Sequence, residues 1–380
     1  MYVAIFVVSL VFAIMFHEFG HYATAKAFGM KVQKFFLGFG PTLWSVRRGE
    51  TEYGVKAIPA GGFVRIVGMS ALEEIDPADR GRTFFEQAAW KRLIVLSAGS
   101  VTHFVLAGVL IFAALTFIGL PVEPGTDVDV VLEGSPAAAA GVRPGDRITA
   151  VNGQPVETFE EVRDLIAVSD GDALAFTIRR DRQEREVEIT PASQRPDGTQ
   201  GAFVGIGPPT IIEPVPPGES LRRTIVGDYS VVAIARQNLT GLGQALNPDA
   251  LARWFGQVDD PGPRSTDGPL SLVGVGQAVN ALGQSGAIFE MLFLFAILNI
   301  TLGTLNMLPL PPLDGGHVAV LLVEQAVNGV RRIGGRAPTW RLDPTVIMPL
   351  ALAVIAFFVV LSVTALYVDI VKPASQLLEQ

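Results

Sequence analysis

Four stretches of the chain are apolar over a length that can cross a membrane. A helix needs about 20 consecutive apolar residues to span the hydrocarbon core of a bilayer. Runs of that length occur at residues 1–28, 93–120, 287–308 and 345–368. A polar cluster interrupts only the first of these runs. The pattern predicts a multi-pass membrane protein with a four-helix transmembrane core.

The long segment between the second and third spans has the pattern of a small folded domain. Short β-like runs surround one helix-like stretch, with strands expected at residues 127–132, 147–151, 174–178 and 185–189 and the helix at 159–168. We expect an α+β domain at residues 121–207. Proline-rich residues 208–217 end it, and residues 221–244 and 248–254 are expected to form amphipathic helices on or near the membrane.

The segments between the spans differ in their balance of basic and acidic residues. Residues 30–92 carry about ten Lys and Arg against seven acids, whereas residues 121–286 carry about thirteen against twenty-three. Basic loops stay on the cytoplasmic side, so the α+β domain is expected outside the plasma membrane, with both termini on the same side. We expect residues 1–29 to remain as the first span, because the polar cluster and the missing basic start do not fit a cleaved signal peptide.

Composition limits the chemistry that the chain can perform. Of 380 residues, 49% are hydrophobic and 17% are charged, and none is a cysteine. Disulfides, thiolate metal ligands and a cysteine nucleophile are therefore excluded. Any bound metal must rest on His, Asp and Glu side chains. No nucleic-acid partner is expected.

The polar cluster of the first span has the spacing of a zinc site. It reads His17-Glu18-Phe19-Gly20-His21, and residues four apart lie on one face of a helix, so both imidazoles can reach one ion. Zinc held by three protein ligands keeps a position for water, and Glu18 can take the proton of that water. Ionised side chains inside a span cost at least about 2.5–3.5 kcal/mol, which favours a functional role for this cluster.

A third ligand is needed, and Asp314 is the best candidate. It follows three prolines that break the helix after the third span. At a rise of 1.5 Å per residue, His17 lies about 24 Å into the first span and Leu308 about 32 Å into the third, so both reach the cytoplasmic half. Irregular backbone at that depth is tolerated where it lines a wet cavity. The alternative is a plain helix terminator followed by an Asp-Gly turn.

Two further histidines lie near these segments. His317 follows the glycine pair after Asp314 and is a candidate partner for a ligand. His103, in the second span, is either a spare ligand or a hydrogen-bonded core residue. We favour the core role, because buried polar groups of membrane bundles usually bond to neighbouring helices.

These motifs together resemble the site-2 protease family, the membrane-embedded zinc metalloproteases of regulated intramembrane proteolysis. The resemblance covers nearly the whole chain. It rests on residues 16–21, on Gly38-Phe39-Gly40-Pro41, on residues 57–63 and on Asn306 through His317. Residues 38–54 are similar to the actinobacterial members in particular, and 23 Arg against 6 Lys fit a GC-rich genome of that kind.

The resemblance implies a complete set of site residues. Zinc would lie on His17, His21 and Asp314, and Glu18 would be the general base. Residues 38–67, which include Gly61 and Gly62, would form a membrane-associated β-loop that pairs with the substrate. Asn306 would help to position the substrate backbone. The substrate would be a single-span membrane protein, such as an anti-sigma factor.

The external domain resembles a PDZ module through residues 134–137 and 141–153, including Gly145-Asp146-Arg147-Ile148. Such modules filter substrates, and some bind C-terminal peptides by strand addition. One departure concerns the second span, where many members have Gly-Pro-x-x-Asn and this chain reads Gly99-Ser100-Val101-Thr102-His103. His103 would then replace Asn as a hydrogen-bonding group or approach the metal.

The predicted organisation has eight segments. They are the first span with its motif (1–29), the cytoplasmic-side β-loop region (30–92), the second span (93–120), the PDZ-like domain (121–207), the linker with amphipathic helices (208–286), the third span (287–308), the Asp-ligand segment (309–344), and the fourth span with its tail (345–380).

Two other classes of protein compete with the protease. An inactive PDZ-bearing scaffold would keep zinc ligands but would need no base, so Glu18 argues against it. A metal transporter would need polar groups across the whole membrane thickness, whereas here they gather in one leaflet.

Overall fold

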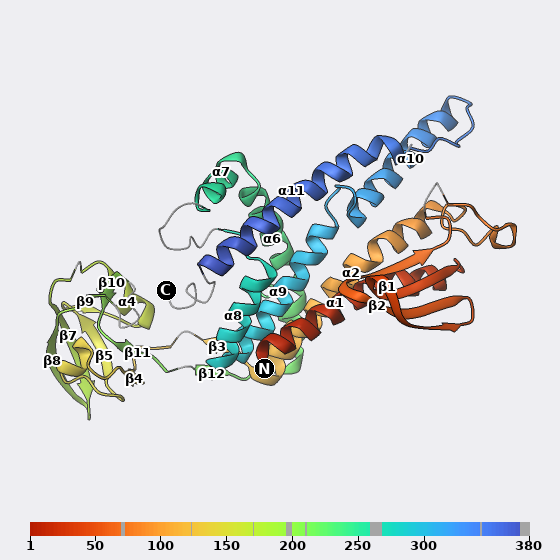
Figure 1. Ribbon diagram of the computed structural model, residues 1–380. Helices are drawn as coiled ribbons and strands as arrows, with labels where there is room; N and C mark the ends of the chain where they lie inside the picture. The colour runs from red at the N-terminus through yellow and green to blue at the C-terminus, as the bar shows by residue number, and fades with distance from the viewer. Residues whose placement is uncertain are drawn as a thin grey trace. The chain divides into compact units, whose positions relative to one another are not determined.

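The computed structural model describes residues 1–69, 73–122, 124–169, 171–194, 200–209, 211–258, 268–342 and 344–372. The chain forms two compact units (Figure 1). The first contains residues 1–114 and the chain from residue 216 onward, and the second contains residues 115–215.

Four helices in the described part of the chain are long and apolar enough to span a membrane, as the sequence predicts. The second begins a turn before the apolar run at residue 93 and includes Arg92, which is buried and lies 3.9 Å from Glu324. The four are α1 (Tyr2–Ala27), α2 (Ala89–Ala113) with a π-helical turn to Ile118, α9 (Ile288–Asn306) and α11 (Pro344–Val371).

Small residues let α1, α2 and α9 pack closely. A Cβ atom added to Gly20 of α1 would lie 2.6 Å from the carbonyl oxygen of Ala98 on α2. One added to Gly303 of α9 would lie 3.2 Å from Cβ of His103 on α2. Membrane helices associate through such close backbone contacts, since burial of apolar surface gives them no advantage over lipid. Helix α2 therefore lies between α1 and α9 and brings both close to its residues 98–103.

Two long strands, β1 (Val32–Arg48) and β2 (Thr51–Ile66), form the β-region expected at residues 38–67. Residues 34–37 of β1 pair on one side with residues 52–55 and on the other with residues 62–65. The hairpin thus folds back on itself, and the end of β2 forms an edge that faces no further described strand. Near its tip Phe39, Leu43 and Trp44 are exposed, which fits contact with lipid.

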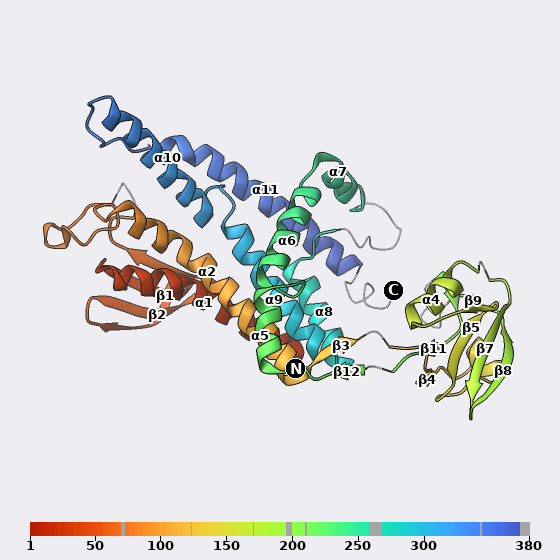
Figure 2. The same cartoon turned by 180° about the vertical axis from the view of Figure 1, so that it is seen from behind.

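The segment after residue 216 differs from the expected pair of surface helices. Residues 221–244 are divided into α5 (Pro217–Ile225) and α6 (Val231–Ala245), because Gly227 adopts a positive φ of 106° that a helix does not accommodate. Helix α7 (Pro248–Gly256) follows. These helices pack on the spans, as Figure 2 shows for α5 and α6. The Asn238 amide donates to Thr301 Oγ1 of α9 at 3.0 Å, and Trp254 Nε1 donates to Thr364 of α11 at 3.2 Å.

Two helices of the first unit were not predicted from the sequence. Helix α8 (Leu272–Gln284) packs through Val275 and Val279 against Phe6 of α1 and Phe295 of α9. Helix α10 (Asp314–Ile333) begins at the proposed third ligand and continues through the segment expected to be a cytoplasmic turn.

The second unit is a small α+β domain. Its sheet has the order β6–β5–β7–β8. Helix α4 begins with a reciprocal capping box between Thr158 and Glu161. The core lies between this helix and the sheet and includes Ile148, Phe176 and Ile178.

The elements of the second unit are β3 (Leu120–Val122), β4 (Val130–Val131), α3 (Pro136–Ala139), β5 (Arg147–Val151), β6 (Gln154–Pro155), α4 (Phe159–Ala167), β7 (Leu174–Arg180), β8 (Gln183–Ile189), β9 (Ala192–Gln194), β10 (Gln200–Phe203), β11 (Ile206–Gly207) and β12 (Ile211–Glu213).

Candidate metal centre

The two histidines of the first span lie on one face of α1. They are four residues apart, and both are buried where α1 meets α2. At 1.5 Å per residue, His17 lies about 22 Å along the helix from Tyr2. The imidazoles are therefore held well inside a helix of spanning length.

Asp314 meets these histidines from the far end of the sequence. Its Oδ2 lies 3.3 Å from Nε2 of His17 and 3.3 Å from Nε2 of His21. The two Nε2 atoms are 3.2 Å apart. A Cβ atom on Gly315 would clash with the backbone of Met307 and Leu308. Only glycine therefore lets the first turn of α10 pack against the loop that contains the prolines of residues 309–312. This packing brings the carboxylate to α1.

The three donor atoms suit a tetrahedrally bound metal ion. Ligands about 2.0–2.1 Å from zinc in a tetrahedron lie about 3.3 Å from one another, which matches the three separations. The site thus sets a carboxylate against two imidazoles, a donor set that zinc accepts.

Helix α2 fixes the second imidazole. Nδ1 of His21 donates to the carbonyl oxygen of Val95 at 2.7 Å, which leaves the lone pair of Nε2 facing His17 and Asp314. A Cβ atom on Gly99 would lie 2.7 Å from Nε2 of His17 and would clash with His21 as well. The absence of a side chain at residue 99 is therefore a condition for the cluster.

Glu18 lies beside the cluster but is not one of the three clustered ligands. The end of β2 covers it, because a Cβ atom on Gly62 would lie 3.0 Å from Cγ of Glu18. The neighbouring Gly61 has a φ of 132° and packs against the ring of Phe39. The structure thus brings the candidate base and both predicted glycines together.

The remaining predicted residues lie at different distances from the cluster. Asn306 is the last residue of α9, half-buried, and its side chain makes no hydrogen bond to another described residue. His317 is exposed on α10 and lies outside the clustered ligands. His103 is 3% exposed and also lies outside them. Its Nδ1 is instead 3.0 Å from Oδ1 of Asn299 on α9.

The sequence did not assign Val95, Gly99 or Asn299 to this site, although Gly99 belongs to the motif noted in the second span. Asn299 also gives a signal, as an amide inside an otherwise apolar span. A backbone carbonyl and a close approach at glycine depend on how α1 and α2 cross, which no spacing along the chain reveals.

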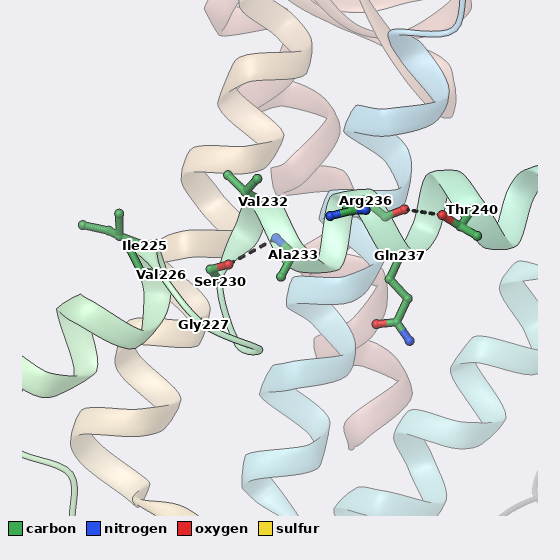
Figure 3. A pocket seen from close by; sticks show the side chains of 9 residues that line it. All are labelled: Ile225, Val226, Gly227, Ser230, Val232, Ala233, Arg236, Gln237 and Thr240. Atoms are coloured by element: carbon green, nitrogen blue, oxygen red, sulfur yellow. Dashed lines mark hydrogen bonds between the residues drawn. The ribbon is translucent and has the colours of Figure 1, made fainter.

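A separate recess of 630 Å³ lies on α5, α6 and the turn between them (Figure 3). Its lining runs from Ile225 to Thr240 and includes Ser230, Arg236 and Gln237. None of the histidines or Asp314 lines it. It is therefore distinct from the candidate metal centre.

Comparison with known proteins covers the chain almost from end to end. The model of the family described as "Peptidase family M50" matches residues 5–334. The chain is 33% identical to "Zinc metalloprotease Rip1" of Mycobacterium bovis over 98% of this chain and 97% of that protein. It is also 33% identical to the protein of the same name from Mycolicibacterium smegmatis, over 98% of each.

A solved structure matches a smaller part. The PDZ domain of the SdrC-like protein from Listeria innocua is 29% identical and covers 22% of this chain and 92% of its own, with a TM-score of 0.20.

Proposed function

The chain belongs to peptidase family M50 and is a zinc metalloprotease, and from this premise we propose that it cleaves a peptide bond within or near the membrane-spanning segment of a single-span membrane protein. The observation that carries the proposal is the cluster of His17, His21 and Asp314, whose donor atoms lie within 4.8 Å of one another beside a helix of spanning length. A hydrolytic centre at that place is suited to a substrate that is itself in the membrane.

The chain's own residues divide the work of hydrolysis. His17, His21 and Asp314 would hold the ion, and the carboxylate would reduce its net charge. When bound, zinc polarises a carbonyl and lowers the pKa of water. Glu18 receives the proton of the attacking water and delivers it to the leaving amine. Gly62 leaves room for the Glu18 side chain beneath the end of β2.

The edge of β2 supports a role in presenting the substrate. A helical substrate shields its peptide groups, so it must unwind before hydrolysis. The end of β2 pairs on one side only among the described strands and lies against Glu18, so an added strand would place its backbone beside the base. Gly61, Gly62 and the amide of Asn306, which has no hydrogen-bond partner among the described residues, are the proposed contacts of that strand.

The charge of the loops supports an orientation. The Lys and Arg of the loop at residues 30–92 favour the cytoplasm, which puts the segment of residues 121–286 outside. We place the PDZ-like domain outside the plasma membrane and the metal centre toward the cytoplasmic leaflet. A C-terminal peptide on that domain and an anti-sigma factor as substrate belong to the same proposal, in which cleavage releases a cytoplasmic effector.

The test is cleavage of a single-span model substrate by the purified chain in detergent, with zinc content measured in parallel. Wild type is expected to bind zinc and cleave, and Glu18→Gln to bind zinc and not cleave, because the amide cannot accept the proton. Glu290→Gln, at the start of α9, is the control and is expected to cleave. Full cleavage by Glu18→Gln would refute the assignment of the base.

A further inference from the structure

A hydrogen-bond chain inside the span bundle fixes the protonation pattern of His103. Nδ2 of Asn299 donates to the carbonyl oxygen of Phe295 at 2.8 Å, and this carbonyl can only accept. The other amide atom facing His103 Nδ1 at 3.0 Å is therefore the oxygen, which also can only accept. Nδ1 of His103 must carry the hydrogen. In the neutral ring Nε2 is then a bare acceptor.

The ring of His103 contacts His17, the proposed metal ligand whose Nδ1 has no hydrogen-bond partner among the described residues. The rings of His103 and His17 have centroids 5.1 Å apart. Nε2 of His17 faces the other two ligands, while its Nδ1 is buried and has no hydrogen-bond partner among the described residues. A neutral imidazole that offers Nε2 to a metal carries its hydrogen on Nδ1. The unpartnered donor of His17 therefore belongs to a ring that contacts the ring of His103.

Two buried hydroxyls add to this polar region. Oγ of Ser100 and Oγ1 of Thr304 also make no hydrogen bond to a described residue. Ser100 lies one turn before His103 on α2, and Thr304 follows Gly303, which packs against His103 and the carbonyl of Ser100. A buried water needs two to four polar partners, and these groups can supply them.

We propose that His103 is a positioning residue for His17, whose Nδ1 hydrogen it accepts on Nε2 through one water. The ring contact keeps the two imidazoles close enough for a single water to reach both. The Nδ1 hydrogen of each proposed metal ligand then has an acceptor: the carbonyl oxygen of Val95 for His21 and, through the water, His103 for His17. This inference rests on the proposed role of His17 as a zinc ligand.

The primary experiment measures zinc affinity of the purified full-length chain by competition with a chelator. His103→Leu is expected to bind zinc about 10–100-fold more weakly, as loss of a partner to a ligating histidine typically does. His103→Gln keeps an acceptor oxygen and is expected to restore most of the affinity. Val105→Ala, exposed on the same helix, is the control and is expected to match wild type.

A second variant tests the hydrogen-bond chain and guards against a folding defect in His103→Leu. Asn299→Leu leaves His103 in place but removes the acceptor that holds the hydrogen on Nδ1. The ring can then protonate on Nε2, so zinc affinity is expected to fall in this variant too. With Co²⁺ in place of zinc, the visible absorption of both leucine variants is expected to differ from wild type, because His17 is no longer held in one orientation.

The outcomes separate this inference from the proposed function. Wild-type zinc affinity and an unchanged cobalt spectrum in His103→Leu would overturn the inference while leaving the protease proposal intact. Equal loss in the glutamine and leucine variants would also overturn it, because packing rather than an acceptor would then be responsible. A wild-type chain that binds no zinc would instead overturn the ligand set itself.

Discussion

Close backbone approach at a single glycine decides whether the metal cluster can form. Gly99→Val is expected to lower zinc affinity by about tenfold or more, since it pushes on both imidazoles that the ion needs. Gly108→Ala is the matched control on α2, because its Cβ atom would make only an ordinary contact at 3.5 Å. Chelator competition on both variants checks this. Equal affinities would mean that the imidazoles can move away from residue 99 without loss.

The third ligand can be tested by removing its charge alone. Asp314→Asn keeps the size of the side chain but offers zinc a neutral amide oxygen, so we expect zinc to be lost more readily on dialysis. Asp129→Asn, exposed in the second unit, is the control. If the Asp314 variant retained zinc as wild type does, the third ligand would have to be sought at His103 or His317.

At the residue scale, the sequence predicts those site residues whose positions follow from helix spacing or from the prolines that end a helix. His17, Glu18 and His21 follow from a four-residue repeat on one face, and Asp314 from an acid after prolines at the right depth. The structure brings these residues together. Asn299 and Val95 could not be assigned, because their roles arise only from the crossing of α2 with α9 and α1.

At the scale of elements, one carboxylate anchors the turn between β1 and β2. Glu50 accepts hydrogen bonds from Arg82 at 2.9 Å and from Lys26 at the end of α1. These bonds, led by that from Arg82, lower the pKa of Glu50 from 4.5 to about 2. A lowered pKa means that the stabilisation is present above the ordinary pKa and is lost as the pH falls toward about 2.

Glu50→Gln is therefore expected to speed hydrogen exchange in the hairpin at neutral pH, because the charged anchor is lost. Exchange measured by mass spectrometry on peptides from residues 32–66 checks this. The difference from wild type should disappear as the pH is lowered from 4.5 to about 2, where Glu50 itself protonates. Glu74→Gln, which has no such anchor, should exchange like wild type throughout. A difference that persisted at low pH would contradict the charge-based explanation.

Elements with a strong pattern were predicted better than those defined by packing. The four spans and helix α4 follow from apolar length and from a helix-like stretch. Helices α8 and α10 were missed because glycines weaken the helical pattern: α8 contains Gly274, Gly276 and Gly283, and α10 begins with the pair Gly315-Gly316. The break at Gly227 was missed because glycine at one position does not by itself reveal a positive φ.

At the scale of the whole molecule, we expect the two compact units to unfold independently of each other. Asp146 is 1% exposed by side chain and pairs with Arg180 at 2.6 Å. Asp146→Asn breaks a buried ion pair, so we expect residues 115–215 to lose about 3–5 kcal/mol of stability. Hydrogen exchange on the full chain should rise there and remain unchanged in α1 and α2. Faster exchange in α1 as well would show that the units unfold together.

The proposed metal ligands lie at positions 17, 21 and 314, and this distance along the chain has a consequence for biogenesis. During synthesis α1 enters the bilayer long before α10 exists, so a growing chain carries two histidines and a base without the carboxylate that completes the set. A nascent or truncated chain that ends before residue 314 is then unable to hydrolyse its neighbours in the membrane. Hydrolytic competence arrives only with the last part of the bundle.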